Sequence, residues 1–234
     1  MMRTFRSART TACLAGVLVT GVTGCVQQGP ALASRARFAS TQGAQQAQSS
    51  EDQILLGRSL VLNHDCMGCH GGTNPASPDW LAGMKTPDQE FLIGPCALDP
   101  AAKPCFRTRP RNLTPDNATG LGRFSERQIF NALRYGLRPE DTPDVEVTSS
   151  TPGVGNFPRR PKYLAPPMPW PGWRYMSDQE LWAIAAYLKR AVKPVSNKVA
   201  DSEGPPDFWA STYTVDKIGP YPPPAFPAAN EHAP

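Results

Sequence analysis

The stretch DCMGCHGG (65–72) places Cys66 and Cys69 three residues apart, with His70 directly after the second cysteine. Two thiols and an imidazole at this spacing suit three kinds of chemistry: a zinc site, a redox-active dithiol, or covalent attachment of a haem. In the haem case the thiols add to two vinyl groups and the imidazole ligates the iron. The other residues of the chain decide which of these three interpretations is favoured.

Neither zinc nor dithiol chemistry accounts for the whole motif. A structural zinc ion takes four ligands, usually with a second cysteine pair or a histidine pair at matching spacing. The other cysteines available, Cys96 and Cys105, are nine residues apart and far downstream. A thioredoxin-type dithiol would lie beside a βαβ pattern, whereas the surrounding pattern here is helical and His70 would be unused. The motif therefore favours a c-type haem.

The N-terminus has the pattern of an export signal. Arg3, Arg6 and Arg9 precede the apolar run ACLAGVLVTGV, which is short for a membrane span. The following VTGC resembles a bacterial lipobox, which predicts a signal peptide over residues 1–24 and a lipid on Cys25. Cleavage after the ALA of residues 31–33 is the alternative and would give a soluble periplasmic protein. Both interpretations take the chain out of the cytoplasm.

Export also explains the net charge and three of the other cysteines. The formal net charge of +4 includes three signal-peptide arginines, and without them basic and acidic residues nearly balance. No segment interleaves basic and aromatic residues as a nucleic-acid groove does, so no nucleic-acid partner is expected. Cys13 lies in the signal peptide. In an oxidising compartment, the remaining Cys96 and Cys105 are expected to form a disulfide across the loop ALDPAAKP.

Three capping-box patterns predict where helices begin. They are Ser50 with Gln53, Ser125 with Gln128, and Ser177 with Glu180. The last predicted helix has an apolar stripe made of Leu181, Ile184, Ala185, Leu188 and Val192.

Gly57 is unfavourable inside the first helix, which predicts close approach of another helix, with the C-terminal helix as the natural partner. No segment alternates long enough to predict a sheet, and 27 Pro and 19 Gly predict long irregular loops. The fold class expected is therefore all-α.

A helix leading into Cys-x-x-Cys-His and a C-terminal helix ending AAYL resemble class I cytochromes c. The likeness extends to NLTPDNATGLG (112–122) and LAPPMPW (164–170). These motifs resemble bacterial cytochromes that include the cytochrome subunits of membrane-bound dehydrogenases. The resemblance covers residues 53–195 and implies a helical fold around one covalent haem c, with long Pro-rich loops and extensions. It departs from the family in the insertion holding Cys96 and Cys105 and in the long stretch 139–165.

The second axial ligand is expected to be Met168. It lies in PPMPW, where prolines fix φ and predict a stiff, extended strap, and the family places its ligand there. Met176 and an open sixth position are the alternatives. The other methionines and histidines are less suitable, since they lie beside the motif, soon after it or in the tail: Met67, Met84, His64 and His232. Arg107, Arg109 and Arg111 could pair with haem propionates, form a docking rim or be solvated. Trp170 and Trp173 are expected to line the haem pocket.

Together these observations predict a signal peptide (1–24), a flexible tether (25–49), a cytochrome c domain (50–196) and a Pro-rich C-terminal extension (197–234). The function implied is single-electron transfer on the periplasmic face of a bacterial membrane, between a redox donor and acceptor such as a membrane-bound dehydrogenase or an oxidase, with no bond chemistry of its own. The alternatives are a haem sensor or peroxidase-like enzyme with a labile sixth ligand, and a structural subunit whose tail docks a partner.

Overall fold

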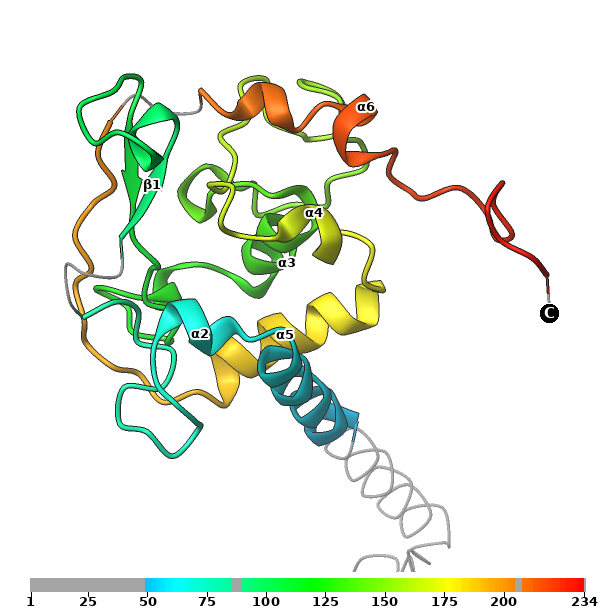
Figure 1. Ribbon diagram of the computed structural model, residues 1–234. Coiled ribbons are helices and arrows are strands. Elements are labelled where there is room, and N and C mark those ends of the chain that lie inside the picture. The colour runs from blue at the N-terminus through cyan, green and yellow to red at the C-terminus, as the bar shows by residue number, and fades with distance from the viewer. Residues whose placement is uncertain (1–48, 86–89, 205–207, 234) are drawn as a thin grey trace, which may run out of the picture. The chain divides into compact units, whose positions relative to one another are not determined.

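Two helices far apart in the sequence cross at a glycine beside the core. One covers residues 49–63 and the other, α5, is Asp178–Arg190. A Cβ atom on Gly57 would lie 1.9 Å from the carbonyl oxygen of Ala183 and 2.8 Å from Cβ of Tyr187. Only a residue without Cβ permits this approach. The expectation that Gly57 marks a contact with the C-terminal helix is therefore confirmed (Figure 1).

The structure is a computed structural model that describes residues 49–85, 90–204 and 208–233. The predicted signal peptide, Cys25 and all of the predicted tether except its last residue lie outside the described residues. In the part of the chain that is described, no helix combines the length and the apolar character needed to cross a membrane.

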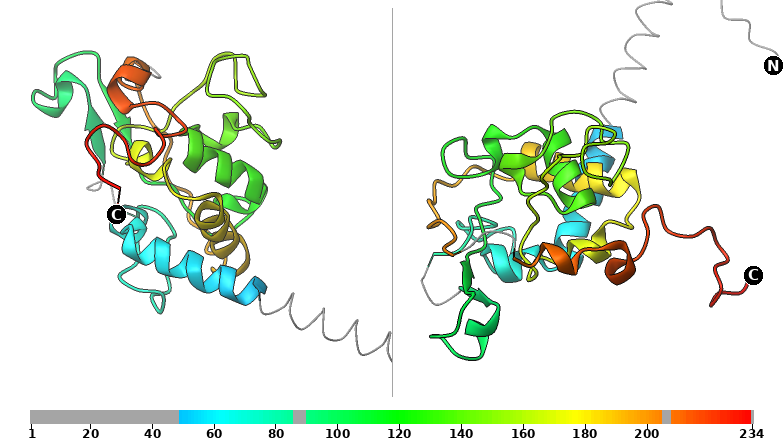
Figure 2. Two further views of the ribbon diagram at one scale, coloured as in Figure 1. Left: turned by 90° about the vertical axis from the view of Figure 1, so that its right-hand side faces the viewer. Right: turned by 90° about the horizontal axis from the view of Figure 1, so that it is seen from above.

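Short helices connect the two crossing helices. After the first helix come α2 (Cys66–His70), α3 (Glu126–Tyr135), α4 (Trp170–Trp173) and α5, and α6 (Val215–Ile218) lies in the C-terminal segment (Figures 1 and 2). The 3-10 helices are η2 (Pro95–Ala97), η3 (Leu121–Arg123), η4 (Pro139–Asp141) and η5 (Ala210–Thr212). Helices α3 and α5 pack on each other.

The apolar stripe predicted for α5 is confirmed, because all five of its residues are buried in one core cluster. The cluster consists of Val61, Trp80, Leu81, Leu121, Phe124, Ile129, Phe130, Leu133, Leu181, Ile184, Ala185, Tyr187, Leu188 and Val192. One hydrogen bond lies within it, from the Trp80 indole to the Tyr187 hydroxyl at 3.0 Å.

The capping boxes predicted for α3 and α5 are confirmed. Ser125 and Gln128 exchange side-chain-to-backbone hydrogen bonds at the start of α3, and Ser177 and Glu180 do so at the start of α5. The prediction of Ser50 as the N-cap of the first helix is wrong, since residues 49 and 50 are already helical. Serine is only mildly unfavourable inside a helix, so a Ser-x-x-Gln pattern does not by itself fix a helix start.

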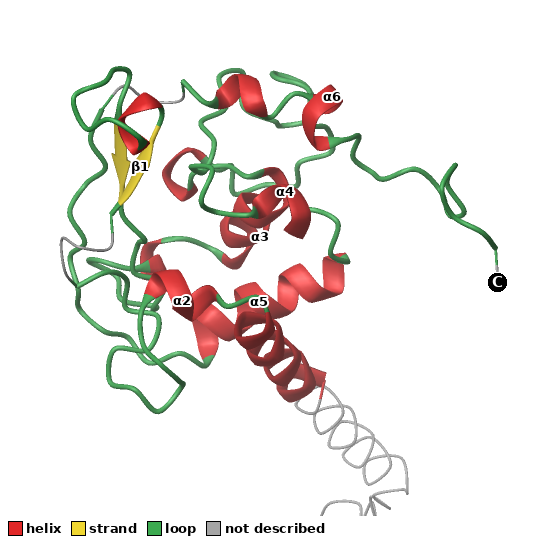
Figure 3. Ribbon diagram, in the orientation of Figure 1, coloured by secondary structure: helices red, strands yellow, loops and turns green. Residues whose placement is uncertain are grey.

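A two-stranded antiparallel sheet departs from the purely helical expectation (Figure 3). Strand β1 (Phe91–Ile93) pairs with β2 (Phe106–Thr108). Three-residue strands are too short to show an alternating pattern, which explains why the sequence did not reveal them. In the connecting loop a disulfide joins Cys96 and Cys105, whose Cα atoms are 5.3 Å apart. The described residues nevertheless contain more helix than strand.

The segment after α5 runs back over the loops of the domain. Glu203 and Arg107 exchange backbone hydrogen bonds of 2.7 and 2.9 Å, which extends the hairpin by one bridge. Farther on, the Tyr213 hydroxyl donates to the carbonyl oxygen of Leu164 at 3.2 Å. The Tyr175 hydroxyl donates to the carbonyl oxygen of Ile218 at 3.0 Å. The C-terminal segment therefore contacts the chain on both sides of the PPMPW stretch.

Replacing Gly57 by alanine is expected to lower the free energy of unfolding by about 3 kcal/mol, since the new methyl group would overlap the backbone of α5. Urea unfolding monitored by circular dichroism measures this change. The matched control is Gly172→Ala in α4, where a Cβ would meet no atom within 4 Å, and its stability should stay within about 0.5 kcal/mol of the parent. Equal stability of the two variants would contradict the crossing contact.

Candidate functional site

The three residues of the opening motif lie together on helix α2. The helix begins after Asp65, whose φ of 52° turns the chain out of the preceding helix, and ends at Gly71 with φ 90°. The thiols of Cys66 and Cys69 are both free. Five residues make little more than one helical turn, so both thiols and the imidazole are held within a short length of chain.

A backbone carbonyl orients the imidazole of His70. Its Nδ1 atom lies 2.7 Å from the carbonyl oxygen of Arg111. A carbonyl oxygen only accepts, so Nδ1 carries the proton and Nε2 of the neutral ring keeps a free lone pair. Burial lowers the pKa of His70, against the opposing effect of this hydrogen bond. The ring is therefore held neutral and in one orientation, with the lone pair of Nε2 available to a ligand-binding atom or metal.

The thiols do not have the electrostatics of a redox dithiol. Burial, with a smaller contribution from the Asp65 carboxylate, raises the pKa of Cys66 to about 11. Burial also raises the pKa of Cys69, with a smaller contribution from Asp65. Reactive Cys-x-x-Cys pairs depend on a lowered thiol pKa. This motif is better suited to holding a group through both sulfur atoms than to thiol–disulfide exchange.

The loop that supplies the Arg111 carbonyl is held by a buried asparagine. The side chain of Asn112 donates to the carbonyl oxygen of Val195 at 2.8 Å and to the Thr119 hydroxyl at 3.0 Å. Its oxygen accepts from the backbone N–H of Thr114 at 2.9 Å. The NLTPD motif therefore ties the loop to the segment after α5. The sequence singled out the motif but not this role, because Val195 is far from it along the chain.

Met168 lies in a turn, not in the extended strap expected from the sequence. Its backbone N–H donates to the carbonyl oxygen of Ala165 at 2.9 Å, which closes a turn over Pro166 and Pro167. Proline fixes φ near −65°, a value that suits turns as well as extended chain. The Met168 side chain is half-buried against the core cluster, as is that of Cys66.

One ring contact brings this part of the chain close to the opening motif. The rings of His64 and Trp173 lie 5.8 Å apart, and these residues come shortly before α2 and shortly after Met168. Met67 and Met176 also pack against the core cluster, so packing alone does not choose among the methionines. Met84 is buried and His232 is exposed.

The arginines after the insertion are paired with carboxylates. Arg107 and Arg109 both bind Glu90, at 2.9 and 2.5 Å, and Arg109 also reaches Glu203 at 3.0 Å. Arg111 pairs with Asp201 at 3.2 Å. The sequence expectation of propionate ligands, a docking rim or a solvated loop did not foresee these ion pairs, since Glu90 and Glu203 come from distant segments.

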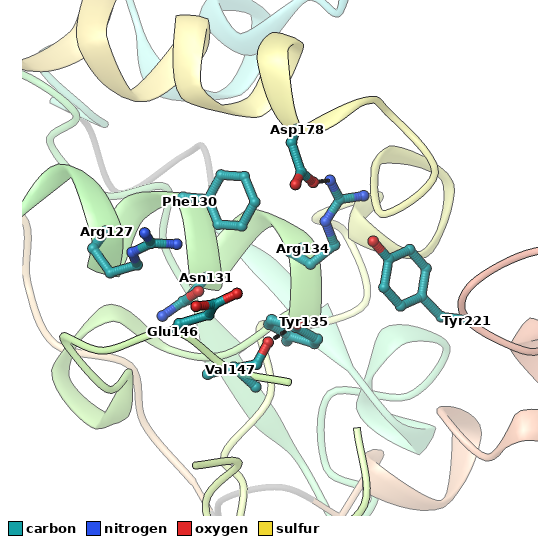
Figure 4. Close-up of a pocket in the computed structure, with 9 residues that line it drawn as sticks. All are labelled: Arg127, Phe130, Asn131, Arg134, Tyr135, Glu146, Val147, Asp178 and Tyr221. Atoms are coloured by element: carbon teal, nitrogen blue, oxygen red, sulfur yellow. Dashed lines mark hydrogen bonds and ion pairs between the residues drawn. The ribbon is translucent and has the colours of Figure 1, made fainter. Parts of the chain in front are cut away.

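A small polar cavity of about 110 Å³ lies on the outer side of α3 (Figure 4). Its walls are Arg127, Phe130, Asn131, Arg134, Tyr135, Glu146, Val147, Asp178 and Tyr221. The buried guanidinium of Arg134 donates to the Asp178 carboxylate at 2.5 Å and to the carbonyl oxygen of Met176 at 2.7 Å. These bonds fasten the start of α5 to α3. None of the residues that line the cavity belongs to the opening motif.

No family model matches the chain. It is 26% identical over 161 residues to a gluconate 2-dehydrogenase cytochrome c subunit of Pantoea cypripedii, an alignment that covers 68% of this chain and 27% of that protein. It is 26% identical over 149 residues to a fructose dehydrogenase cytochrome subunit of Gluconobacter japonicus, covering 64% and 23%. A quinone alcohol dehydrogenase cytochrome c subunit of Gluconobacter oxydans (strain 621H) is 23% identical over 166 residues, covering 70% and 27%.

The relatives of this chain are therefore cytochrome subunits of dehydrogenases, as the sequence motifs predicted. Each bears the name of the cytochrome subunit and not that of a catalytic subunit, which agrees with the expectation that the chain is no enzyme in its own right. The chain spans about a quarter of the length of the curated relatives it matches.

Replacing Asn112 by alanine is expected to lower the free energy of unfolding by about 3 kcal/mol, because it removes three hydrogen bonds and leaves buried backbone groups without partners. Chemical denaturation measures the loss. Asn117→Ala, an exposed position in the same loop, is the control and should change stability by less than about 0.5 kcal/mol. If the two variants were equally stable, the amide would not hold the loop.

Proposed function

We propose that the chain is a membrane-tethered, monohaem c-type cytochrome that transfers single electrons for a membrane-bound dehydrogenase. The observation that carries this proposal is the hydrogen bond of His70 to the Arg111 carbonyl, within a Cys-x-x-Cys-His helix whose thiols are both free. The names of the relatives support the same class.

The residues of α2 fit a covalently attached haem. Cys66 and Cys69 would form the two thioether links, and Nε2 of His70 would ligate the iron on one side. The Arg111 carbonyl leaves that nitrogen unprotonated and orients the ring. When bound, the haem supplies a one-electron couple at the iron. A free dithiol would leave the oriented Nε2 without a purpose, and among the described residues no group of His, Cys, Asp and Glu side chains is placed to complete a zinc site.

Met168 is the proposed second axial ligand. The turn closed by Ala165 and the flanking prolines restrict the backbone around it, and the side chain packs beside the apolar core. With His70 and Met168 both bound, the iron would have no open position, which would favour electron transfer over binding of small molecules, and the thioether would raise the reduction potential.

The proposed attachment to the membrane uses a lipid on Cys25, followed by the tether of residues 25–49. Stable anchoring of this kind takes more than one acyl chain. The relatives are named as cytochrome subunits of dehydrogenases, and a membrane-bound enzyme of this kind is the proposed electron donor. An oxidised partner in the respiratory chain is the proposed acceptor.

The ferric protein is expected to show the weak long-wavelength absorption band of methionine–iron ligation, and Met168→Ala should abolish it. The control is Met176→Ala, which removes another methionine that packs against the core cluster and should keep the band. A band that persists in Met168→Ala would contradict the ligand assignment. A high-spin parent that binds carbon monoxide or peroxide readily would instead favour a haem sensor or peroxidase-like enzyme.

Cys25→Ala is expected to release the protein from the membrane fraction, because the residue that carries the lipid is gone. Mass spectrometry of the purified parent should give an acylated Cys25 as the first residue. An unmodified N-terminal residue after position 33 would contradict the anchor and favour the soluble alternative.

A further inference from the structure

The disulfide loop, residues 95–105, holds the most exposed large hydrophobic side chain in the described part of the chain. Leu98 is 96% exposed. Four apolar neighbours in the loop are exposed as well: Pro95, Ala97, Pro100 and Ala101. A single exposed leucine is ordinary on a protein surface. Here the leucine and its neighbours together make one apolar patch on a short piece of chain.

The fold holds this patch in a defined shape. A disulfide closes the loop. The backbone N–H groups of Leu98 and Asp99 both donate to the carbonyl oxygen of Pro95 at 3.1 Å. The Asp99 carboxylate accepts from the backbone N–H of Ala101 at 3.0 Å, and the prolines of the loop fix φ at their positions. A loop ordered in this way loses little conformational entropy when a partner binds it.

The base of the loop is fixed to the domain. Phe106, the first residue of β2, is buried, and its ring lies 4.5 Å from that of Trp209. Glu90, directly before β1, binds both Arg107 and Arg109. In the views of Figures 1 and 2 the loop lies at the edge of the domain, away from α5. The apolar patch is thus held outward on a fixed support.

This support leads directly to the proposed haem site. Strand β2 ends at Thr108, and the carbonyl that orients His70 belongs to Arg111, three residues farther on. Three residues of chain span at most about 10 Å. Between them, Arg109 is held by ion pairs with two carboxylates. A protein that binds the disulfide loop would therefore be kept at a set distance from His70.

The composition of the loop favours a protein pocket without charge. Its ionic residues, Asp99 and Lys103, cancel each other in charge. Segments that lie in a lipid surface combine several basic residues with aromatic ones, whereas this loop has one basic residue and no aromatic residue. A leucine contributes to binding when a partner removes it from water. The patch therefore fits an uncharged apolar pocket on another protein.

We propose that Leu98 and the exposed apolar residues around it dock into an uncharged apolar pocket on the dehydrogenase subunit that delivers electrons to this chain. This inference rests on the proposed function, and it names the surface through which the chain and that enzyme assemble. A subunit needs a lasting interface with its enzyme, and lasting interfaces are the more apolar ones. Docking at this loop sets how tightly the two proteins associate and leaves the haem and its ligands unchanged.

The first test places a photoreactive benzophenone amino acid at position 98 of the full chain, in cells of the source organism. Irradiation should give a covalent adduct with a dehydrogenase subunit, identified by mass spectrometry. The control is the same amino acid in place of Leu55, which is 56% exposed on the first helix and should give no such adduct. The proposal is overturned by equal labelling from both positions. It is also overturned if position 98 labels only a second copy of this chain, a protein of another class, lipid or nothing.

The second test measures reduction of the ferric holoprotein by membranes of a strain that lacks this chain, supplied with the substrate of the cross-linked dehydrogenase. Leu98→Ser should raise the cytochrome concentration that gives half the maximal rate by about tenfold, since one buried apolar contact is lost. The maximal rate, the midpoint potential and the reduction by ascorbate should match the parent. Leu55→Ser is the matched control and should match the parent throughout. An unchanged half-saturating concentration in Leu98→Ser, or a changed midpoint potential, would overturn the proposal.

Failure of this inference is distinguishable from failure of the proposed function. Leu98→Ser changes a side chain that lies almost wholly in water, so the variant should fold as the parent does, which urea unfolding checks. A parent without covalent haem would defeat the proposed function itself, and its absorption spectrum shows this independently. A parent that carries the haem, with a Leu98→Ser variant that is reduced as readily, would remove the docking surface alone.

Discussion

The contact of Gly57 with Ala183 and Tyr187 fixes the relative position of the two helices that lead to the site. The first helix ends at residue 63, immediately before α2, so its placement also places the thiols and His70. The other helix, α5, begins only ten residues after Met168. Arg134 binds both the Met176 carbonyl and Asp178 at the start of α5, which joins that helix end to α3. One close backbone contact therefore constrains the positions of both proposed ligands, His70 and Met168.

A second constraint acts on the imidazole through the backbone. The carbonyl of Arg111 can orient His70 only if its loop is rigid, and Asn112 makes it so by bonding to Thr114, Thr119 and Val195. Asn197 continues this network, since its side chain donates to the carbonyl oxygen of Ala82 at 2.8 Å. The segment after α5 thus holds both the loop that contains Arg111 and the chain that follows α2. A buried amide suits this task because it donates and accepts at once.

The sequence was most informative where the signal is local. The caps at Ser125 and Ser177, the apolar stripe of α5 and the meaning of Gly57 all follow from residue types within a few helical turns. It was least informative where partners are distant or a residue has two uses. Three-residue strands carry no readable period, and proline in PPMPW suited a turn as well as a strap. The partners of Arg109 depend on tertiary packing, which no local pattern encodes.

The arginines of the hairpin and the buried Arg174 have different surroundings. At the hairpin, Arg107 and Arg109 are matched by Glu90 and Glu203, and the chain without its signal-peptide arginines is nearly neutral. The buried Arg174 is instead set against aromatic rings next to the Met168 turn. Long-range steering requires an uncompensated surface field, so the proposed partner would be recognised mainly by short-range fit.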